Sequence, residues 1–444
     1  MTSKSEDESK SEDESKSKND IAWENIFLEY QILDEISKHG YYKIKSSVIN
    51  KYRESRLMAK YDHATNLPKI FTKNKLSILP ISRSEYIVGK FHVFQKVRYN
   101  NALEYLPMSF PNCIQTLDIN KIHSESTALH CAYISKMLDH IAGEKTLLTI
   151  SGRMTTDNFS FHIKSTNPGE PYHISVNNAQ CEIDAGFESE NKLILIEAKN
   201  YEVSDFNIRQ LYYPYRLWKS KVDKEIIPVL LTYSNDIFSF FIYEFDDDSN
   251  YNSIHLVDQK RYIIGSESIS LEDILVVINN TSTIEEPEVP FPQADRFERI
   301  VDLINLLFEG ELSKEEITSR YQFNVRQTGY YTNAAIYLGL VHKYKNPETK
   351  EILYYLSDQG KNILKLRYKK KYLSLVQLII QHKIFNEVIL LYTSNGYPPS
   401  RNEIIQIMKK IGLFNVQNES DTIERRARTV LSWINWILNL KNVE

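Results

Sequence analysis

The chain has 444 residues, of which 42% are hydrophobic and 25% are charged, so it can form about three domains with apolar cores. Only 13 glycines and 14 prolines occur, and no apolar run reaches about 18 residues, which excludes collagen-like, proline-rich and membrane-spanning classes. The charged N-terminus does not resemble a secretory signal, and three cysteines without a CxxC pair favour a reduced, cytoplasmic protein without a zinc finger. The formal net charge of −4, taken alone, argues against nucleic acid as a partner.

The distribution of charge changes that inference. Residues 1–20 carry four lysines and seven acidic residues, a net charge of −3. Residues 295–444 carry 22 basic and 16 acidic residues, a net charge of +6, which leaves −7 for residues 21–294. A basic C-terminal third beside an acidic middle predicts separate modules, one of which contacts phosphates.

The first two regions differ in character. Residues 1–20 contain a tandem SKSEDE repeat without apolar residues after Met1, which predicts a disordered charged tail. From Ile21 onward apolar residues recur at helical spacing until Gly40, and β-rich runs follow at 76–81 and 86–91. We therefore expect a small α+β region over 21–110, for which the sequence suggests no chemistry.

Residues 111–290 have the order of an α/β unit with a mixed sheet. A helix is predicted over 124–143 and another over 205–218. The predicted strands cover 146–150, 159–163, 173–176, 183–187, 192–198, 226–233 and 237–245.

The C-terminal part predicts two helical modules. In residues 295–370, a helix over 295–308 precedes a capping box of Ser313 and Glu316, a second helix over about 326–340 and a hairpin-like segment over 340–357. That order is typical of a winged helix. Residues 371–444 contain a second capping box, Ser400 with Glu403, and a helix over 422–438, which predicts a second helical or winged-helix-like module.

One segment, CEIDAGFESENKLILIEAKN, carries the chemistry. Its apolar run 193–196 is typical of a strand buried on both faces, and alternation places Glu197 and Lys199 on one face of its end. A hairpin through 188–191 would bring Asp184 beside them. Carboxylates that bind Mg²⁺ and a lysine that orients water suit phosphodiester hydrolysis. The alternative, an exposed Glu/Lys pair at a strand end, is common.

These residues resemble the PD-(D/E)XK nuclease superfamily, and more narrowly the type II restriction endonucleases. The resemblance covers most of 21–440: SESTALHCAYISKML is similar to the first core helix, SGRMTTDNFSFHI to the next strand region, NIRQLYYPYRLW to the helix after the metal-binding hairpin, and RRARTVLSWINWI to the C-terminal segment. Ile183 stands where the superfamily name has proline. The resemblance implies that Asp184 and Glu197 bind Mg²⁺ and that Lys199 is the catalytic lysine. Glu125, in the first turn of the first core helix, would be a further acidic catalytic residue, although an acid there also stabilises a helix dipole.

Several residues are candidate DNA contacts, each with a solvated surface or linker role as the alternative. Related nucleases use a Gln-containing helix to position DNA or the lysine, but Gln210 is followed by Pro214 where some relatives have tyrosine. The second helix of the first winged-helix module and the arginine-rich helix of the second suit base edges or phosphates. The candidates are Arg153, Arg209, Gln210, Arg326, Gln327, Arg425, Arg426 and Arg428.

The sequence therefore predicts an α/β (α+β) PD-(D/E)XK core with C-terminal winged-helix modules. The expected function is that of a type II restriction endonuclease, which hydrolyses double-stranded DNA at a short specific sequence with Mg²⁺. A palindromic site would be matched most simply by a homodimer, and a cognate DNA methyltransferase is the expected genetic partner. The alternatives are a repair or structure-selective nuclease, and a winged-helix DNA-binding regulator with an inactive nuclease fold.

Overall fold

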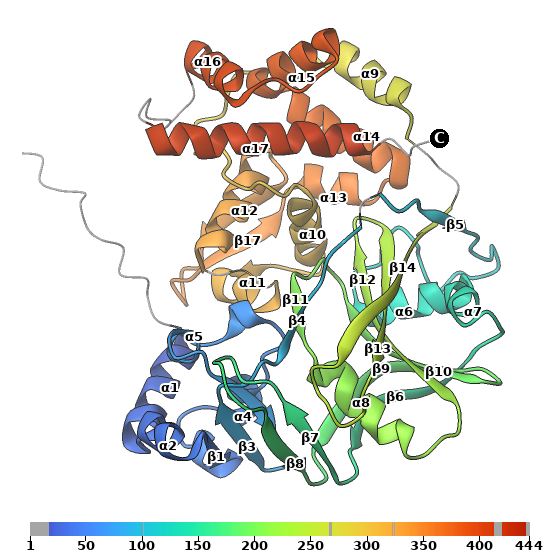
Figure 1. The fold of residues 1–444 in the computed structure, drawn as a ribbon. Helices are drawn as coiled ribbons and strands as arrows, with labels where there is room; N and C mark the ends of the chain where they lie inside the picture. Colours follow the sequence, from blue (N-terminus) through green and yellow to red (C-terminus); the bar gives the residue numbers. More distant parts are fainter. Residues whose placement is uncertain are drawn as a thin grey trace, which may run out of the picture.

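The computed structural model describes residues 17–100, 102–265, 269–321, 323, 325–412 and 420–440. A seven-stranded mixed sheet lies at the centre, a small α+β region precedes it, and helices follow it (Figure 1). Residues 1–16 of the expected charged tail lie outside the described residues. None of the helices in the described part of the chain combines the length and apolar character of a membrane span.

The N-terminal region begins with a capped helix. The Ser17 Oγ accepts the N–H of Asp20, and the Asp20 carboxylate accepts the N–H of Ser17, which starts the helix at Lys18. The expected tail over 1–20 is therefore wrong for residues 18–20. The helix expected from Ile21 is two helices, separated at Gln31 with a φ of 47°. Three strands form a sheet in the order β1-β3-β2. The elements are α1 (Lys18–Glu29), α2 (Ile32–His39), β1 (Tyr41–Lys45), α3 (Ser46–Ile49), α4 (Ser55–Ala59), η1 (Ala64–Asn66), α5 (Lys69–Lys73), β2 (Ser77–Pro80) and β3 (Glu85–Gly89).

The central sheet has the strand order β5-β14-β13-β12-β10-β9-β6. Strands β6, β9 and β10 pair antiparallel, and α8 then crosses over so that β12 runs parallel to β10. The elements are β4 (Phe94–Lys96), β5 (Leu106–Met108), α6 (Glu125–Ile134), α7 (Met137–Ala142), β6 (Leu147–Thr155), β7 (Phe159–Ile163), β8 (Tyr172–Val176), β9 (Gln180–Glu188), β10 (Lys192–Lys199), β11 (Asp205–Asn207), α8 (Arg209–Lys219), β12 (Glu225–Ser234), β13 (Ile237–Phe245) and β14 (Ile254–Ile264).

The apolar run of β10 is buried on both faces, as its sequence predicts. Leu193 and Leu195 belong to the core that includes residues of α8, whereas Ile194 and Ile196 belong to the core that includes residues of α6 and α7. The helix expected over 124–143 is interrupted at Lys136, which has a φ of 61°. The first residues of the helix expected over 205–218 instead form β11, which pairs with β4.

The C-terminal region contains the expected helices and hairpin of residues 295–370, and β15, β17 and β16 form a three-stranded sheet. The described part of 371–444 is helical, without a wing strand, and residues 413–419 lie outside the described residues. One apolar core extends through both expected modules, and the boundary expected at 370 lies inside α14. The elements are α9 (Leu271–Asn280), α10 (Glu298–Leu307), β15 (Leu312–Ser313), α11 (Lys314–Arg320), α12 (Val325–Tyr337), β16 (Val341–Lys345), β17 (Ile352–Leu356), α13 (Asp358–Leu364), α14 (Tyr368–Ile380), α15 (Lys383–Asn395), α16 (Arg401–Ile411) and α17 (Ser420–Asn439).

The C-terminal region packs on the end of the sheet where β10 ends and the β12–β13 turn protrudes (Figure 1). In that turn, Ser234 Oγ donates a 2.7 Å hydrogen bond to Asp302 of α10. Next to it, the carboxylate of Asp236 lies 2.5 Å from the Nζ of Lys371 on α14. Lys199 pairs in register with Thr232, two residues before Ser234, so the contact between the regions lies beside the candidate site.

Candidate active site

Strands β9 and β10 bring the predicted triad Asp184, Glu197 and Lys199 together. Glu197 and Lys199 point to the same face of β10 and are only 8% and 7% exposed. Backbone pairing between the two strands ends at Ala185 and Ile196. Beyond that point the Asp184 Oδ2 accepts the N–H of Ala198 at 2.7 Å, so a side chain continues the connection between the strands.

The pairing of β9 with β6 is irregular next to Asp184, where the register shifts between Ile150 and Gly152. Ile183 and Ala185 are two residues apart but belong to apolar cores on opposite faces of the sheet. A regular strand would place both on one face. The alternation is therefore broken at Asp184, a feature that the sequence pattern of this segment does not indicate.

Two donors converge on one oxygen of Glu197. The Nζ of Lys199 lies 2.6 Å from Glu197 Oε1, and the Nε2 of Gln210 on α8 donates to the same atom. Gln210, a candidate DNA contact from the sequence, is buried and holds the carboxylate of Glu197. Arg209, its neighbour, contacts the site through the carboxylate of Asp62.

The sequence did not reveal Asp62, which enters the site from the loop between α4 and η1. Its carboxylate lies 4.0 Å from Lys199 Nζ and 3.8 Å from the Nη2 of Arg209. Burial raises the pKa of Asp62, but the nearby charges of Lys199 and Arg209 outweigh that effect, and the pKa is lowered. No motif surrounds Asp62, and the N-terminal region gave no other sign of chemistry.

The other carboxyl groups of the site have pKa values above those that they would have in water. Burial, reinforced by Asp184 and Asp62, raises the pKa of Glu197 to about 8. Burial also raises the pKa of Asp184 and of Glu125. Burial opposes the ammonium form of Lys199, yet Glu197, Asp62 and Glu125 raise its pKa well above the usual value.

Glu125 is the first residue of α6, whose N-terminus is capped by Ser124. Its charge interacts with those of Lys199, Asp184 and Asp62, so the structure brings this predicted residue to the same cluster. Burial raises the pKa of Tyr201, two residues after Lys199. The charges of Lys199, Glu125 and Asp62 also affect that pKa. The site thus draws residues from α6, β9, β10, α8 and the N-terminal loop.

Residues of the C-terminal region flank the segment that follows Lys199. The ring of Tyr201 stacks on that of Tyr321, with centroids 5.0 Å apart. Glu202 forms an ion pair with Arg296, which precedes α10. Residues of all three regions of the chain therefore lie at or beside the candidate site.

Two of the basic candidate DNA contacts lie at the site. Arg209 faces Asp62, and the exposed Arg153 lies on β6 with its Nε 3.4 Å from Glu182 Oε1. Glu182 contributes to the pKa shifts of Asp184 and Glu125, so Arg153 lies at the margin of the acidic cluster.

The other candidates lie on the C-terminal helices. Arg326 and Gln327 occupy the first turn of α12, where the exposed Arg326 donates to the Tyr330 hydroxyl at 2.6 Å. On α17, Arg425 is exposed, and Arg428 lies 3.4 Å from Asp295.

Arg426 corrects the expectation of a three-arginine DNA-binding face. Its side chain is only 7% exposed, and burial lowers its pKa. It lies three residues after Ile423 and four before Val430, both of which are buried in the core of the C-terminal region. Arg426 is therefore a packing residue of α17, and DNA cannot reach its guanidinium in this arrangement.

The donor set is compatible with Mg²⁺, although three protein ligands are not assembled. Within the ranges that the structure describes, no group of three or more His, Cys, Asp or Glu side chains is arranged to hold a metal ion. Mg²⁺ commonly binds through one or two carboxylates, with water and substrate phosphates completing its shell. Asp184 and Glu197 provide two crowded carboxylates whose pKa values are raised, a condition that a divalent cation would relieve.

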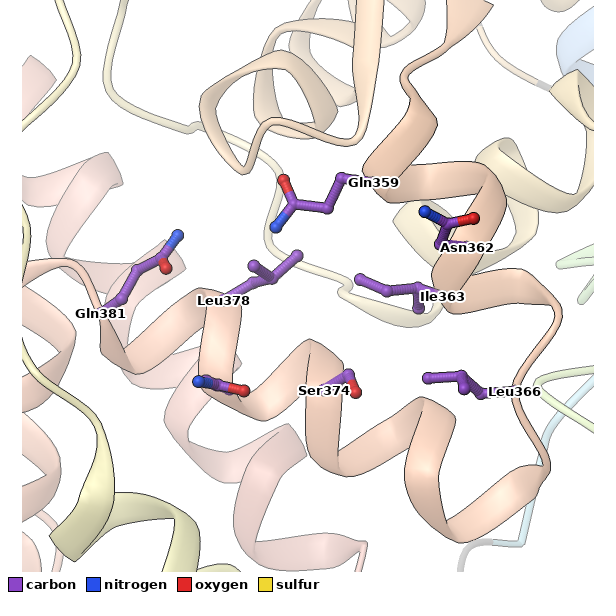
Figure 2. Close-up of a pocket in the computed structure, with 8 residues that line it drawn as sticks. Gln359, Asn362, Ile363, Leu366, Ser374, Leu378 and Gln381 are labelled. Carbon is purple, nitrogen blue, oxygen red and sulfur yellow. The ribbon is translucent and has the colours of Figure 1, made fainter.

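A separate groove lies away from these residues, between α13 and α14, with a volume of about 540 Å³ (Figure 2). Amide side chains dominate its lining, among them Gln359, Asn362, Gln377 and Gln381. None of the candidate catalytic residues borders it.

Comparisons with known proteins divide the chain into three parts without assigning an activity. Three family models match, each described as a domain of unknown function: DUF6996 over residues 20–88, DUF6997 over 89–263 and DUF7226 over 299–442. No curated protein and no solved structure matches the chain. Asp62 lies in the first matched part, whereas Glu125, Asp184, Glu197 and Lys199 lie in the second.

Proposed function

We propose that the chain is a Mg²⁺-dependent endonuclease of the PD-(D/E)XK type, and more narrowly a type II restriction endonuclease for double-stranded DNA. The observation that carries the proposal is the convergence of Asp184, Glu197 and Lys199 at one end of β9 and β10. The raised pKa values of the two carboxylates support a site that is completed by a cation.

Each side chain has a role in this proposal. Asp184 and Glu197 would hold Mg²⁺, which polarises a phosphoryl oxygen and lowers the pKa of bound water when it is present. Lys199 would orient the attacking water and offset negative charge that develops on the phosphate. Gln210 would keep the Glu197 carboxylate in place through its hydrogen bond.

The order of elements also supports the proposal. The resemblance implies a first core helix, a strand, a metal-binding hairpin and a further helix, and α6, β6, β9–β10 and α8 occur in that order. In the C-terminal region, α10, α11, α12 and the hairpin β16–β17 follow the order expected for a winged helix, and the short strand β15 is added before α11. In that arrangement α12 would be the recognition helix, and its first turn carries Arg326 and Gln327.

The direct test is digestion of unmethylated plasmid and genomic DNA by the full chain with Mg²⁺. Discrete fragments would support sequence-specific cleavage. A smear, or cleavage restricted to branched DNA, would favour a repair or structure-selective nuclease, and the absence of cutting would favour a DNA-binding regulator with an inactive nuclease fold.

Variants assign the activity to the site. Lys199→Ala and Glu197→Ala should abolish cutting, whereas Lys192→Ala should retain it. Lys192 starts the same strand at its opposite end, where its Nζ donates to the Ala142 carbonyl at 2.9 Å. Cutting by both site variants would overturn the assignment of these residues.

Two partners follow from the proposal. A palindromic target would be matched by a two-fold homodimer, which light scattering of the free and DNA-bound chain would detect. A restriction enzyme also requires protection of the host DNA, so a DNA methyltransferase of the same specificity is the expected genetic partner.

A further inference from the structure

Asp62 is an acidic side chain of the site that comes from the N-terminal region. It lies in the short loop between α4 and η1, more than 120 positions before the other carboxylates of β9 and β10. Two cations face its carboxylate: Lys199 Nζ at 4.0 Å and Arg209 Nη2 at 3.8 Å. Its side chain is 42% exposed, so it borders the open side of the cluster.

The loop is anchored by groups other than this carboxylate. The backbone carbonyls of Tyr61 and Asp62 accept hydrogen bonds from Asn207, at 3.0 and 2.8 Å. The buried ring of His63 contacts the Asp205 carbonyl through Nδ1 at 2.7 Å and the Tyr201 hydroxyl through Nε2 at 3.3 Å. These contacts fix the loop against β11, and a change confined to the Asp62 carboxylate leaves all of them in place.

The location of Asp62 affects the electrostatic attraction that holds the Lys199 ammonium in place. The ammonium is buried and lies 2.6 Å from Glu197, and Glu125 adds a weaker attraction. Asp62, at 4.0 Å, provides a second close attraction and also faces Arg209, the neighbour of Gln210. A lysine held between two carboxylates keeps a defined position beside the reacting groups, and small displacements of such groups strongly affect rates.

We infer that Asp62 is a positioning residue, through which the N-terminal region orients Lys199 and Arg209 for the hydrolysis of a phosphodiester. The inference rests on the proposed function. It makes the N-terminal region a part of the catalytic unit, although the triad belongs to the central region.

The test compares Asp62→Asn with Asp62→Glu and with Asp157→Asn in the full chain. Asp157 is a matched control, because it is an exposed carboxylate that faces the single cation Lys221 at 3.4 Å, outside the site. Single-turnover cleavage with Mg²⁺ measures the rate constant, and binding of the same DNA with Ca²⁺ measures affinity. Thermal unfolding establishes that each variant is folded.

Asp62→Asn should lower the cleavage rate constant by about 10- to 100-fold. Its DNA affinity should stay equal or increase, because a negative charge has been removed near the phosphate. Asp62→Glu should recover part of the rate, and Asp157→Asn should match the wild type.

An unchanged rate for Asp62→Asn would overturn the inference. An increased rate would also overturn it, because it would show that the carboxylate occupies the position of a phosphate and blocks the site. A wild-type chain that cuts no DNA would overturn the proposed function together with this inference. Full activity of Asp62→Asn beside an active wild type would overturn the positioning role alone.

Discussion

The Nζ of Lys199 lies 2.6 Å from the Oε1 of Glu197, and both side chains are buried at the same end of β10. Asp184 and Asp62 add two more carboxylates around this pair. A buried pair of this kind depends on its surroundings, because burial of ions costs free energy that their attraction offsets only with good geometry. The cluster therefore links protonation to stability and, under the proposed function, to the binding of a cation.

Affinity for a divalent cation should rise with pH through about pH 8. The pKa of Glu197 is raised to about 8, mainly by burial, so below that pH a proton competes with the cation for the carboxylate. The affinity should change by up to about tenfold per pH unit below the pKa and level off above it. Calorimetric titration with Ca²⁺ between about pH 6 and pH 9 measures this dependence. Glu197→Gln should lose the dependence along with most of the affinity, and an affinity independent of pH in the wild type would contradict the assignment.

The same raised pKa should make the metal-free protein less stable as pH increases. The unfolded Glu197 ionises near its usual pKa of 4.5 and the folded one near 8, so between these values the native state binds more protons than the unfolded state. The free energy of unfolding should therefore fall across this window. In urea titrations, the decline should be smaller for Glu197→Gln than for the wild type. Equal slopes for the two proteins would show that the folded carboxyl is not protonated in this range.

The central triad could be predicted because it depends on local pattern. Strand alternation relates Glu197 to Lys199, and a short hairpin brings the strand of Asp184 alongside. Asp62 could not be predicted, since its place depends on the docking of the 60–63 loop against β11, far away in the sequence. Local pattern also does not predict the contact of Gln210 with Glu197, because that contact depends on how α8 crosses the sheet.

The helices and strands show the same difference between what local pattern predicts and what tertiary contacts determine. Strands with continuous apolar runs and helices with capping boxes lie close to the predicted positions. Strand β14 was not predicted, because its first half, after Ile254, is exposed and polar side chains interrupt its sequence. The break of the predicted helix at Lys136 was also missed, since a single residue with positive φ leaves the apolar periodicity almost unchanged. The hydrophobic pattern of the sequence thus identifies the helices and strands that face a core. Exposed strands and breaks within helices depend on tertiary contacts.

Arg425 and Arg426 should respond differently to substitution, although they are adjacent. Arg426 packs in the core of the C-terminal region, whereas Arg425 is exposed on the same helix. Arg426→Ala should lower the free energy of unfolding by about 1–3 kcal/mol, because it removes buried side-chain contacts. Arg425→Ala should leave stability within about 0.5 kcal/mol of the wild type. Denaturant titration of the two variants measures both effects, and equal losses would show that Arg426 is not a packing residue.

The ion pair between Asp236 and Lys371 should hold the C-terminal region against the end of the sheet that carries the candidate site. The two groups are 2.5 Å apart, and the Lys371 side chain is only 4% exposed. Removing one partner leaves the other charge without its counter-ion in a partly dry environment, so Lys371→Met should lower the free energy of unfolding by about 3–5 kcal/mol. Asp236→Asn combined with Lys371→Met removes both charges, and its loss should be smaller than the sum of the two single losses.

Urea titrations of the wild type, both single variants and the double variant measure the four free energies of unfolding of this double-mutant cycle. Lys369→Met is the control, because Lys369 is a more exposed lysine of the same helix that pairs with Asp273 at 2.7 Å. Its loss should be at most about 1 kcal/mol.

Because Asp236 follows the strand that pairs with Lys199, Lys371→Met should also reduce cleavage, and Asp236→Asn should restore part of it in the double variant. Additive losses of stability would contradict a direct interaction between the two charges. Unchanged cleavage in a folded Lys371→Met variant would show that this contact stabilises the protein without affecting the site.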